Sequence, residues 1–324
     1  MATIVLDEEK TDAQNEWVAK VTCVLGARQG MDAPAGYEPK IEEGSPVEKA
    51  RRERRKALIV PREHGAWGLL LVPMVTGGGV ALRENNNVFP LLLLLTAALM
   101  LFWLRTPLES LLGTSAIKAQ TDEEQRDVMF AAGYLATVAG VALAMLLWAG
   151  HNPYLWWIGI AAGVTFAAQA LLKKLGRQAR MLSEIVGTIG LTAAAPAAYY
   201  VVTGKLGPTA WMLWVANLLF AGDQIHYVQL RIHTAKVQGF RAKLAHGWAF
   251  ALGQALMTAI ITLACMTRLM PPIASLAFSP LLFRGWFYFV QEPKPLAVRR
   301  LGWSELVHAS AFCVLLIATF VVAK

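Results

Sequence analysis

Several ionisable side chains lie inside stretches that are otherwise apolar, and chemistry is most expected there. Asp223, His226 and Tyr227 fall within the apolar stretch 209–230, and Arg231 follows it. Residues three and four apart share one face of a helix, so these side chains would form one polar stripe in which Asp223 orients His226 or pairs with Arg231. A carboxylate beside an imidazole suits acid–base catalysis. We expect Asp223 and His226 to be catalytic. We expect Tyr227 and Arg231 to bind substrate, unless the stripe is only a helix end that meets water or lipid headgroups.

A second charged group stands at the entry to the first apolar stretch, in the sequence Pro-Arg-Glu-His-Gly-Ala-Trp-Gly at 61–68. Proline is favoured as the first residue of a helix, and the N–H groups at a helix N-terminus attract anions. We expect Glu63 to be catalytic. We expect Arg62, His64 and Trp67 to bind an anionic substrate; the alternative is a headgroup anchor in which Glu63 only pairs with Arg62.

The sequence offers little support for a metal site. Glu305 and His308 are three residues apart, a spacing used in metal-binding helix bundles, but no second pair of this kind is present. The three cysteines are scattered and show no metal-ligand spacing. A charge buried in hydrocarbon costs about 2.5–3.5 kcal/mol or more. The charged residues within the apolar stretches therefore predict one polar cavity that opens to the cytoplasm.

The composition is that of a membrane protein. The chain has 324 residues, of which 56% are hydrophobic and 16% charged, whereas soluble domains carry about 25% charged residues. Apolar stretches near the length that spans a bilayer, about 20 residues, recur to the C-terminus. They predict an all-α polytopic membrane protein with about nine transmembrane helices. The expected spans are 64–82, 88–104, 127–149, 153–172, 184–203, 209–230, 247–267, 271–290 and 304–323.

The basic residues predict the orientation in the membrane. About 21 Lys and Arg residues, Arg284 included, fall on the N-terminal approach and the loops after every second stretch, against about four on the other side. Cytoplasmic loops carry such an excess. We therefore expect a cytoplasmic N-terminus and an external C-terminus. The same bias accounts for the net charge of +8, so nucleic acid is not an expected partner, whereas the lipid bilayer is.

The N-terminal segment differs from the rest. Residues 1–57 mix acidic, basic, Gly and Pro residues without periodicity, which predicts a disordered cytoplasmic extension ahead of a transmembrane domain at 58–324. The basic cluster at its end would lie against anionic headgroups.

Three polar residues predict helix starts. Thr121 and Glu124 have the spacing of a capping box. Ser183 and Ser304, each followed by Glu, have the form of N-caps.

The segment 61–68, followed by Leu-Leu-Leu-Val-Pro at 69–73, resembles the hallmark of the YwiC-like family of bacterial integral membrane proteins. The resemblance runs from about residue 58 to the C-terminus and leaves the first 57 residues as an addition. It implies a location in the bacterial inner (cytoplasmic) membrane and no particular activity.

A more distant resemblance is to the UbiA superfamily of intramembrane prenyltransferases. These have nine helices and place their chemistry at the cytoplasmic ends of helices 2–3 and 6–7, which here hold Arg105-Thr-Pro-Leu-Glu109 and the segment 223–231. The resemblance implies a UbiA-like bundle in which Arg105 and Glu109 bind substrate. UbiA enzymes hold Mg²⁺ and a prenyl diphosphate with two DxxxD motifs, and neither place has one here. The cofactor is therefore left open, with Mg²⁺ held by Glu109 and Asp223 as one candidate.

These observations lead to one main hypothesis and two alternatives. In the main hypothesis, the cavity binds or transfers an isoprenoid or other lipid-like anion, held directly by cationic side chains. These are Arg62, His64, Arg105 and Arg231. The first alternative is a proton-coupled transporter or lipid-handling permease, in which buried Glu and His residues relay protons. The second is a non-catalytic membrane scaffold that recruits partners through its long tail.

Overall fold

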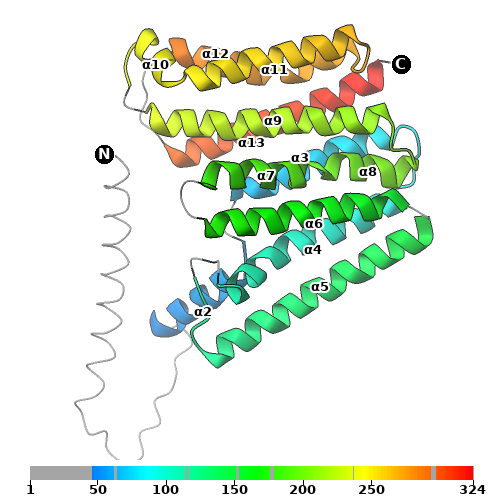
Figure 1. The fold of residues 1–324 in the computed structure, drawn as a ribbon, viewed down its shortest axis with the longest axis vertical. Helices are drawn as coiled ribbons and strands as arrows, with labels where there is room; N and C mark the ends of the chain where they lie inside the picture. Colours follow the sequence, from blue (N-terminus) through cyan, green and yellow to red (C-terminus); the bar gives the residue numbers. More distant parts are fainter. Residues whose placement is uncertain are drawn as a thin grey trace, which may run out of the picture. The chain divides into compact units, whose positions relative to one another are not determined.

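The computed structural model describes residues 46–61, 64–113, 115, 117–150, 153–175, 179–235, 237–292 and 297–323. The regular structure in these residues is entirely helical (Figure 1). The chain divides into two units, at 1–52 and 53–324, and the contacts below all lie within the second.

Apart from α2 and α10, the helices occur where the apolar stretches predict them. They are α2 Pro46–Ile59, α3 His64–Ala81, α4 Phe89–Leu111, α5 Asp122–Gly150, α6 Pro153–Lys174, α7 Arg180–Thr192, α8 Ala194–Thr203, α9 Pro208–His233, α10 Phe240–His246, α11 Trp248–Met266, the 3₁₀ helix η2 Pro272–Phe278, α12 Ser279–Val290 and α13 Val298–Val322. The fifth predicted stretch is shared by α7 and α8, and the eighth by η2 and α12. The short helix α10 lies in a loop between two predicted stretches.

Seven helical stretches in the described part of the chain are long and apolar enough to cross a membrane, so this is a multi-pass membrane protein. They are Phe89–Leu111, Asp122–Trp148, Pro153–Lys174, Met181–Thr203, Trp248–Met266, Pro272–Val290 and Arg299–Val322. Of the two other predicted spans, α3 contributes only the shorter apolar segment Trp67–Ala81, and α9 is not among the candidates. The polar side chains of α9 lower its hydropathy. Nine crossings and a UbiA-like arrangement therefore stay predictions.

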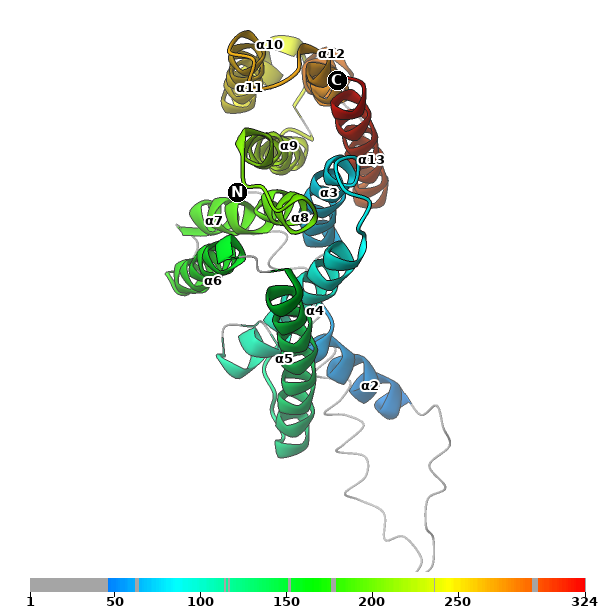
Figure 2. The same ribbon diagram turned by 90° about the vertical axis from the view of Figure 1, so that its right-hand side faces the viewer.

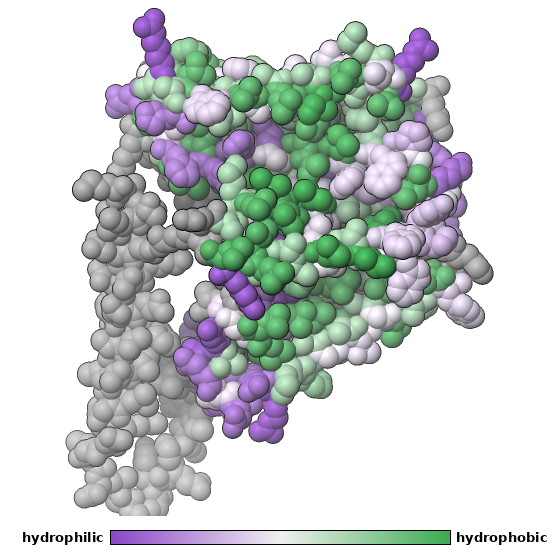
Figure 3. All heavy atoms as spheres, in the orientation of Figure 1, coloured by the Kyte–Doolittle hydropathy of each residue, from purple (hydrophilic) through white to green (hydrophobic). Residues whose placement is uncertain are grey.

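The helix α9 occupies a central place in the second unit. It contacts α3, α7, α8, α11 and α12, and Figures 1 and 2 show it between α11 on one side and α7 and α8 on the other. Residues of α9 belong to the main hydrophobic core. There the ring of Phe220 of α9 stacks on that of Phe312 of α13, with 4.4 Å between the ring centroids. In Figure 3, hydrophobic residues cover the middle of the face formed by α6, α9 and α11, and more polar residues lie at its margins.

The predicted helix starts are confirmed at one place and wrong at two. The backbone N–H of Glu124 donates to Thr121 Oγ1 at 3.2 Å, and α5 begins directly after this cap. Ser183 and Ser304 lie inside α7 and α13, which begin several residues earlier. The Ser183 hydroxyl donates to the carbonyl of Gln169 at 3.4 Å, so it bonds to a neighbouring helix and caps nothing.

Residues 46–57, predicted to end a disordered extension, belong to α2. Within 53–59 the helix has partners that its own sequence does not reveal. Arg54 Nε donates to Glu124 Oε1 at 2.8 Å, Leu58 is buried, and the Trp103 indole donates to the carbonyl of Ile59 at 2.9 Å. The prediction for residues 1–45 lies outside the described residues.

A close approach of α3 and α8 yields a stability prediction. A Cβ at Gly77 would collide with the backbone carbonyl of Ala195, and backbone cannot move aside as a side chain can. Gly77→Ala should therefore lower stability by about 1–3 kcal/mol, measured by thermal unfolding in detergent. Gly68→Ala on the same helix is the control, because a Cβ there meets nothing within 4 Å. Equal unfolding temperatures for the two variants would contradict the close packing.

Candidate functional site

Three charged side chains, one each from α9, α12 and α13, contact one another. Arg284 of α12 donates through Nη2 to Asp223 Oδ2 of α9 at 2.7 Å. Its Nη1 donates to both carboxylate oxygens of Glu305 of α13 at 2.6 Å. All three residues are buried, with no more than 8% of each exposed. We call this group the Arg284 bridge; it joins α9, α12 and α13 with one guanidinium for two carboxylates.

Uncharged neighbours complete the bridge. The Gln254 amide of α11 donates through Nε2 to Asp223 Oδ1, and Arg284 Cζ lies 4.0 Å from the ring centroid of Tyr227, a cation–π contact. A Cβ at Gly285 would lie 2.8 Å from Gln254 Cδ, so glycine at this position leaves room for the amide. Asp223 thus pairs with Arg284 and Gln254, and not with the His226 or Arg231 expected from the sequence.

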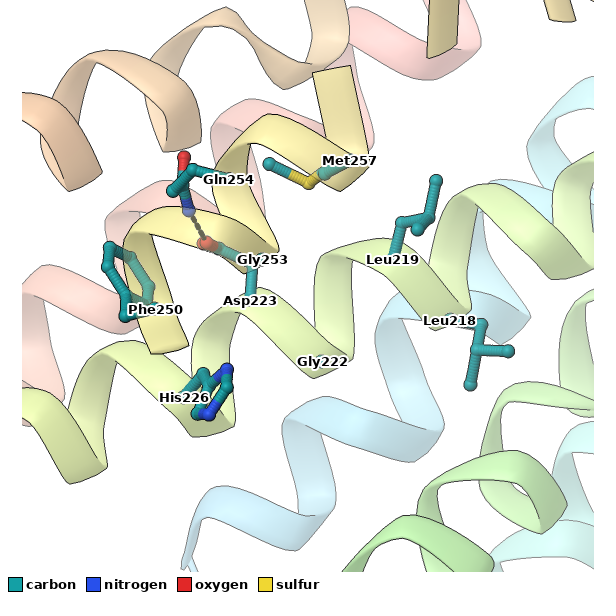
Figure 4. Close-up of a pocket in the computed structure, with 9 residues that line it drawn as sticks. All are labelled: Leu218, Leu219, Gly222, Asp223, His226, Phe250, Gly253, Gln254 and Met257. Carbon is teal, nitrogen blue, oxygen red and sulfur yellow. Dashed lines mark hydrogen bonds between the residues drawn. The ribbon is translucent and has the colours of Figure 1, made fainter. Parts of the chain in front are cut away.

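A cavity of about 170 Å³ lies between α9 and α11, next to the bridge (Figure 4). It is lined by Leu218, Leu219, Gly222, Asp223, His226, Phe250, Gly253, Gln254 and Met257. Figure 4 shows leucine and methionine side chains at one end and Asp223, His226 and Gln254 at the other. The cavity therefore has an apolar end and a polar end, and Asp223 connects it to the bridge.

Cationic side chains gather at the C-terminal end of α9. Arg231 Cζ and Lys243 Nζ lie 5.1 and 4.8 Å from the ring centroid of Tyr288. Lys243 is 1% exposed and donates to the carbonyl of Gln291 at 2.6 Å, where a cation is favoured at the end of α12. Burial lowers the pKa of Lys243, and the charge of Arg231 lowers it further. Together with Arg284, these residues give the described cluster three cations against the two carboxylates of the bridge.

Arg105 and Glu109, predicted to bind substrate, belong to a second group of ion pairs, apart from the Arg284 bridge. Arg105 Nε donates to Glu109 Oε1 at 2.9 Å, and Lys173 Nζ of α6 donates to the same oxygen at 2.8 Å. In Figures 1 and 2, α3, α7 and α8 lie between α4, which carries Arg105 and Glu109, and α9. The polar residues that the sequence assigns to a single cavity are thus divided between separate groups in the described part of the chain.

The entry segment is described only in part. The Trp67 ring lies 4.8 Å from that of Phe102 and packs α3 on α4. His64 begins α3, but its side chain and the whole of Arg62 and Glu63 lie outside the described residues. Their predicted roles stay predictions.

The described residues do not form a metal site. They contain no group of three or more His, Cys, Asp or Glu placed to hold a metal ion. Mg²⁺ prefers carboxylate oxygens, but Asp223 and Glu305 both bind Arg284. Glu109 is likewise bound to two cationic side chains. The Mg²⁺ considered from the sequence does not fit these residues.

Three residues of the site are absent from the sequence-based candidates. Arg284 is counted there with the basic loop residues, although it lies within the stretch 271–290. A charge inside an apolar stretch is the signal that would have identified it. Gln254 is likewise a polar residue inside an apolar stretch, 247–267. Lys243 lies in a loop between two predicted stretches, and nothing in the sequence distinguishes it from other basic residues.

Comparisons with known proteins find similarity to one family and to one curated protein. A family model described as "YwiC-like protein" matches residues 60–199. This segment of the chain resembles that family. A curated relative, the "Uncharacterized protein YwiC" of Bacillus subtilis (strain 168), is 25% identical over 261 residues, which cover 79% of this chain and 95% of the relative. No solved structure matches. The YwiC-like resemblance expected from the sequence is confirmed, the resemblance to UbiA stays a prediction, and the matched family model ends within α8, before the bridge and cavity.

The Arg284 bridge yields a second stability prediction. Arg284→Met should destabilise it by about 3–5 kcal/mol, because two buried carboxylates lose their cation. Unfolding in detergent measures the loss, and Arg241→Met, at an exposed position of α10, is the matched control. Adding Asp223→Asn and Glu305→Gln to Arg284→Met should restore much of the stability. An Arg284→Met protein as stable as the control would contradict the role of the bridge.

Proposed function

We propose that this protein binds an anionic isoprenoid or other lipid-like molecule in the cavity between α9 and α11. The supporting observation is the polarity of the cavity, which is apolar at Leu219 and Met257 and polar at Asp223 and His226. Ligand sites are typically apolar with a few polar groups that orient the ligand. An amphiphile would lie along α9 with its chain at the apolar end.

Arg231 supports an anionic head group. It lies five residues beyond His226, or about 7–8 Å along the helix axis, and its Nε is buried without a hydrogen-bond partner among the described residues. The charge of Arg284 is already offset by two carboxylates, so Arg231 is the better ligand for an anion. Guanidinium groups bind phosphate strongly and with defined geometry.

We further propose that the protein transfers the bound isoprenoid or lipid-like group and that its helices form a UbiA-like bundle. His226 would then act as the general acid or base, since both oxygens of Asp223 already accept hydrogen bonds. Glu63 stays a second candidate from the sequence. The proposed setting is the bacterial inner membrane, which rests on the similarity to a bacterial protein. The proposed cytoplasmic N-terminus and nine crossings rest on the distribution of Lys and Arg along the chain.

The proposal predicts metal-independent binding of a short isoprenoid diphosphate. Purified protein in detergent should bind dimethylallyl diphosphate both in EDTA and with Mg²⁺, as measured by equilibrium dialysis of the labelled compound. Arg231→Ala and His226→Ala should each weaken binding at least tenfold, because they remove the groups at the head. Arg241→Ala, at an exposed position on α10, should bind like the parent protein. No binding by the parent protein, or equal binding by Arg231→Ala, would rule the proposal out.

A second candidate is a proton-coupled transporter or permease. The observation that favours it is a pair of buried carboxylates beside a partly buried histidine, inside helices that are otherwise apolar. Flux of the same diphosphate into proteoliposomes, driven by a pH gradient and lost in His226→Ala, would support transport. Binding without flux would support the first candidate.

A further inference from the structure

The cavity between α9 and α11 is only partly enclosed, and a glycine from each helix lines it. These are Gly222 of α9 and Gly253 of α11. Gly222 is exposed, and a Cβ at its position would meet nothing within 4 Å. A Cβ at Gly253 would meet only His226 Nδ1, at 3.7 Å. The cavity therefore has an opening to the outside of the molecule at Gly222.

Apolar side chains stand beside this opening. Leu252 and Leu256 of α11 are 59% and 58% exposed, and each directly precedes a residue that lines the cavity. Helix α11 is long and apolar enough to cross a membrane, and exposed leucines on such a helix suit contact with lipid chains. Figure 3 shows hydrophobic residues over the middle of the face that α9 and α11 share with α6. The opening at Gly222 thus lies on a face suited to lipid rather than to water.

The polarity of the cavity runs in the same direction as that of a lipid leaflet. Trp248, the first residue of α11, is 63% exposed, and tryptophan is enriched where a membrane helix meets water. Phe250 and Met257 follow it by two and nine residues, which places the cavity about 3–14 Å further along the helix axis. The polar end at His226 lies beside Phe250, nearer to Trp248 (Figure 4). An amphiphile in that leaflet has its head and chain already aligned with the two ends of the cavity.

We propose that the ligand of this cavity resides in the bilayer and enters sideways through the opening at Gly222. The proposal rests on the proposed function, that the cavity binds an anionic lipid-like molecule, and it adds the source and the route of that molecule. Sideways entry keeps the apolar chain out of water, where its exposure is unfavourable. The charged head moves only along the membrane surface, toward Arg231 at the end of α9.

The first test asks what the opening faces and needs no ligand. A nitroxide spin label is attached to Gly222→Cys after the three native cysteines are replaced by serine, and the protein is placed in phosphatidylcholine nanodiscs. Power-saturation EPR then compares collisions with oxygen, which concentrates in lipid, and with a nickel chelate, which stays in water.

The oxygen-to-nickel collision ratio of the label at position 222 is judged against two references. It should match, within about twofold, that of a label at Leu256→Cys, which is exposed on the apolar helix α11. It should be at least fivefold higher than that at Arg241→Cys, which is exposed on the short helix α10. A ratio equal to that at Arg241→Cys would overturn the lateral opening.

The second test obstructs the route. Gly222→Leu places a branched side chain in the opening, so association and dissociation of labelled farnesyl diphosphate in nanodiscs should both slow at least tenfold. The matched control is Gly163→Leu, at an exposed glycine of α6 that also has space for a Cβ and does not line the cavity. Both of its rates should stay within twofold of the parent protein. Thermal unfolding shows whether Gly222→Leu is folded; if it is not, the spin-label test decides.

The outcomes separate this inference from the function on which it rests. If the parent protein does not bind farnesyl diphosphate, the proposed function fails. If it binds, but the label at position 222 is exposed to water, the entry route is overturned while the proposed function stands. Folded Gly222→Leu protein that takes up the compound as fast as the parent protein would overturn the route in the same way.

Discussion

The cavity depends on the ion pairs of Arg284. A carboxylate at the position of Asp223 would be costly in an apolar helix, and Arg284 offsets that cost by placing a guanidinium against it and against Glu305. The planar guanidinium can bind both carboxylates while its face contacts Tyr227. Because Asp223 is held in this way, Gln254 is oriented by its hydrogen bond to Asp223 Oδ1. Two of the polar groups that line the cavity are thus positioned by one cation on a third helix.

Hydropathy predicts where the helices lie but not which of them are neighbours. The nine apolar stretches all contain helices, since long apolar runs have few other solutions in a membrane. The sequence also predicts how far along its helix a polar residue lies. Asp223 and His226, predicted to face a cavity, do line one. The sequence predicts Arg105 and Asp223 in one cavity because both lie toward the predicted cytoplasmic ends of their apolar stretches. Their lateral separation depends on the order in which helices pack, which no single stretch encodes.

The partners of polar residues were the least predictable feature. Local spacing favours His226 or Arg231 as the partner of Asp223, but its actual partners come from α11 and α12. Serines that have the form of helix caps lie inside helices, and Ser183 bonds to α6. In both cases a contact between distant segments replaces the contact that the neighbouring sequence suggests. Arg284 differs, because it lies in the middle of α12 and a count of basic residues for orientation groups it with loop residues.

The distance in sequence between Asp223 and Arg284 has a consequence for biosynthesis. Arg284 follows Asp223 by 61 residues, which at usual translation rates corresponds to roughly 3–12 s. During that interval α9 has emerged from the ribosome, while the guanidinium that neutralises its carboxylate has not. The contact between α9 and α12 can therefore form only after these further residues have been added to the chain.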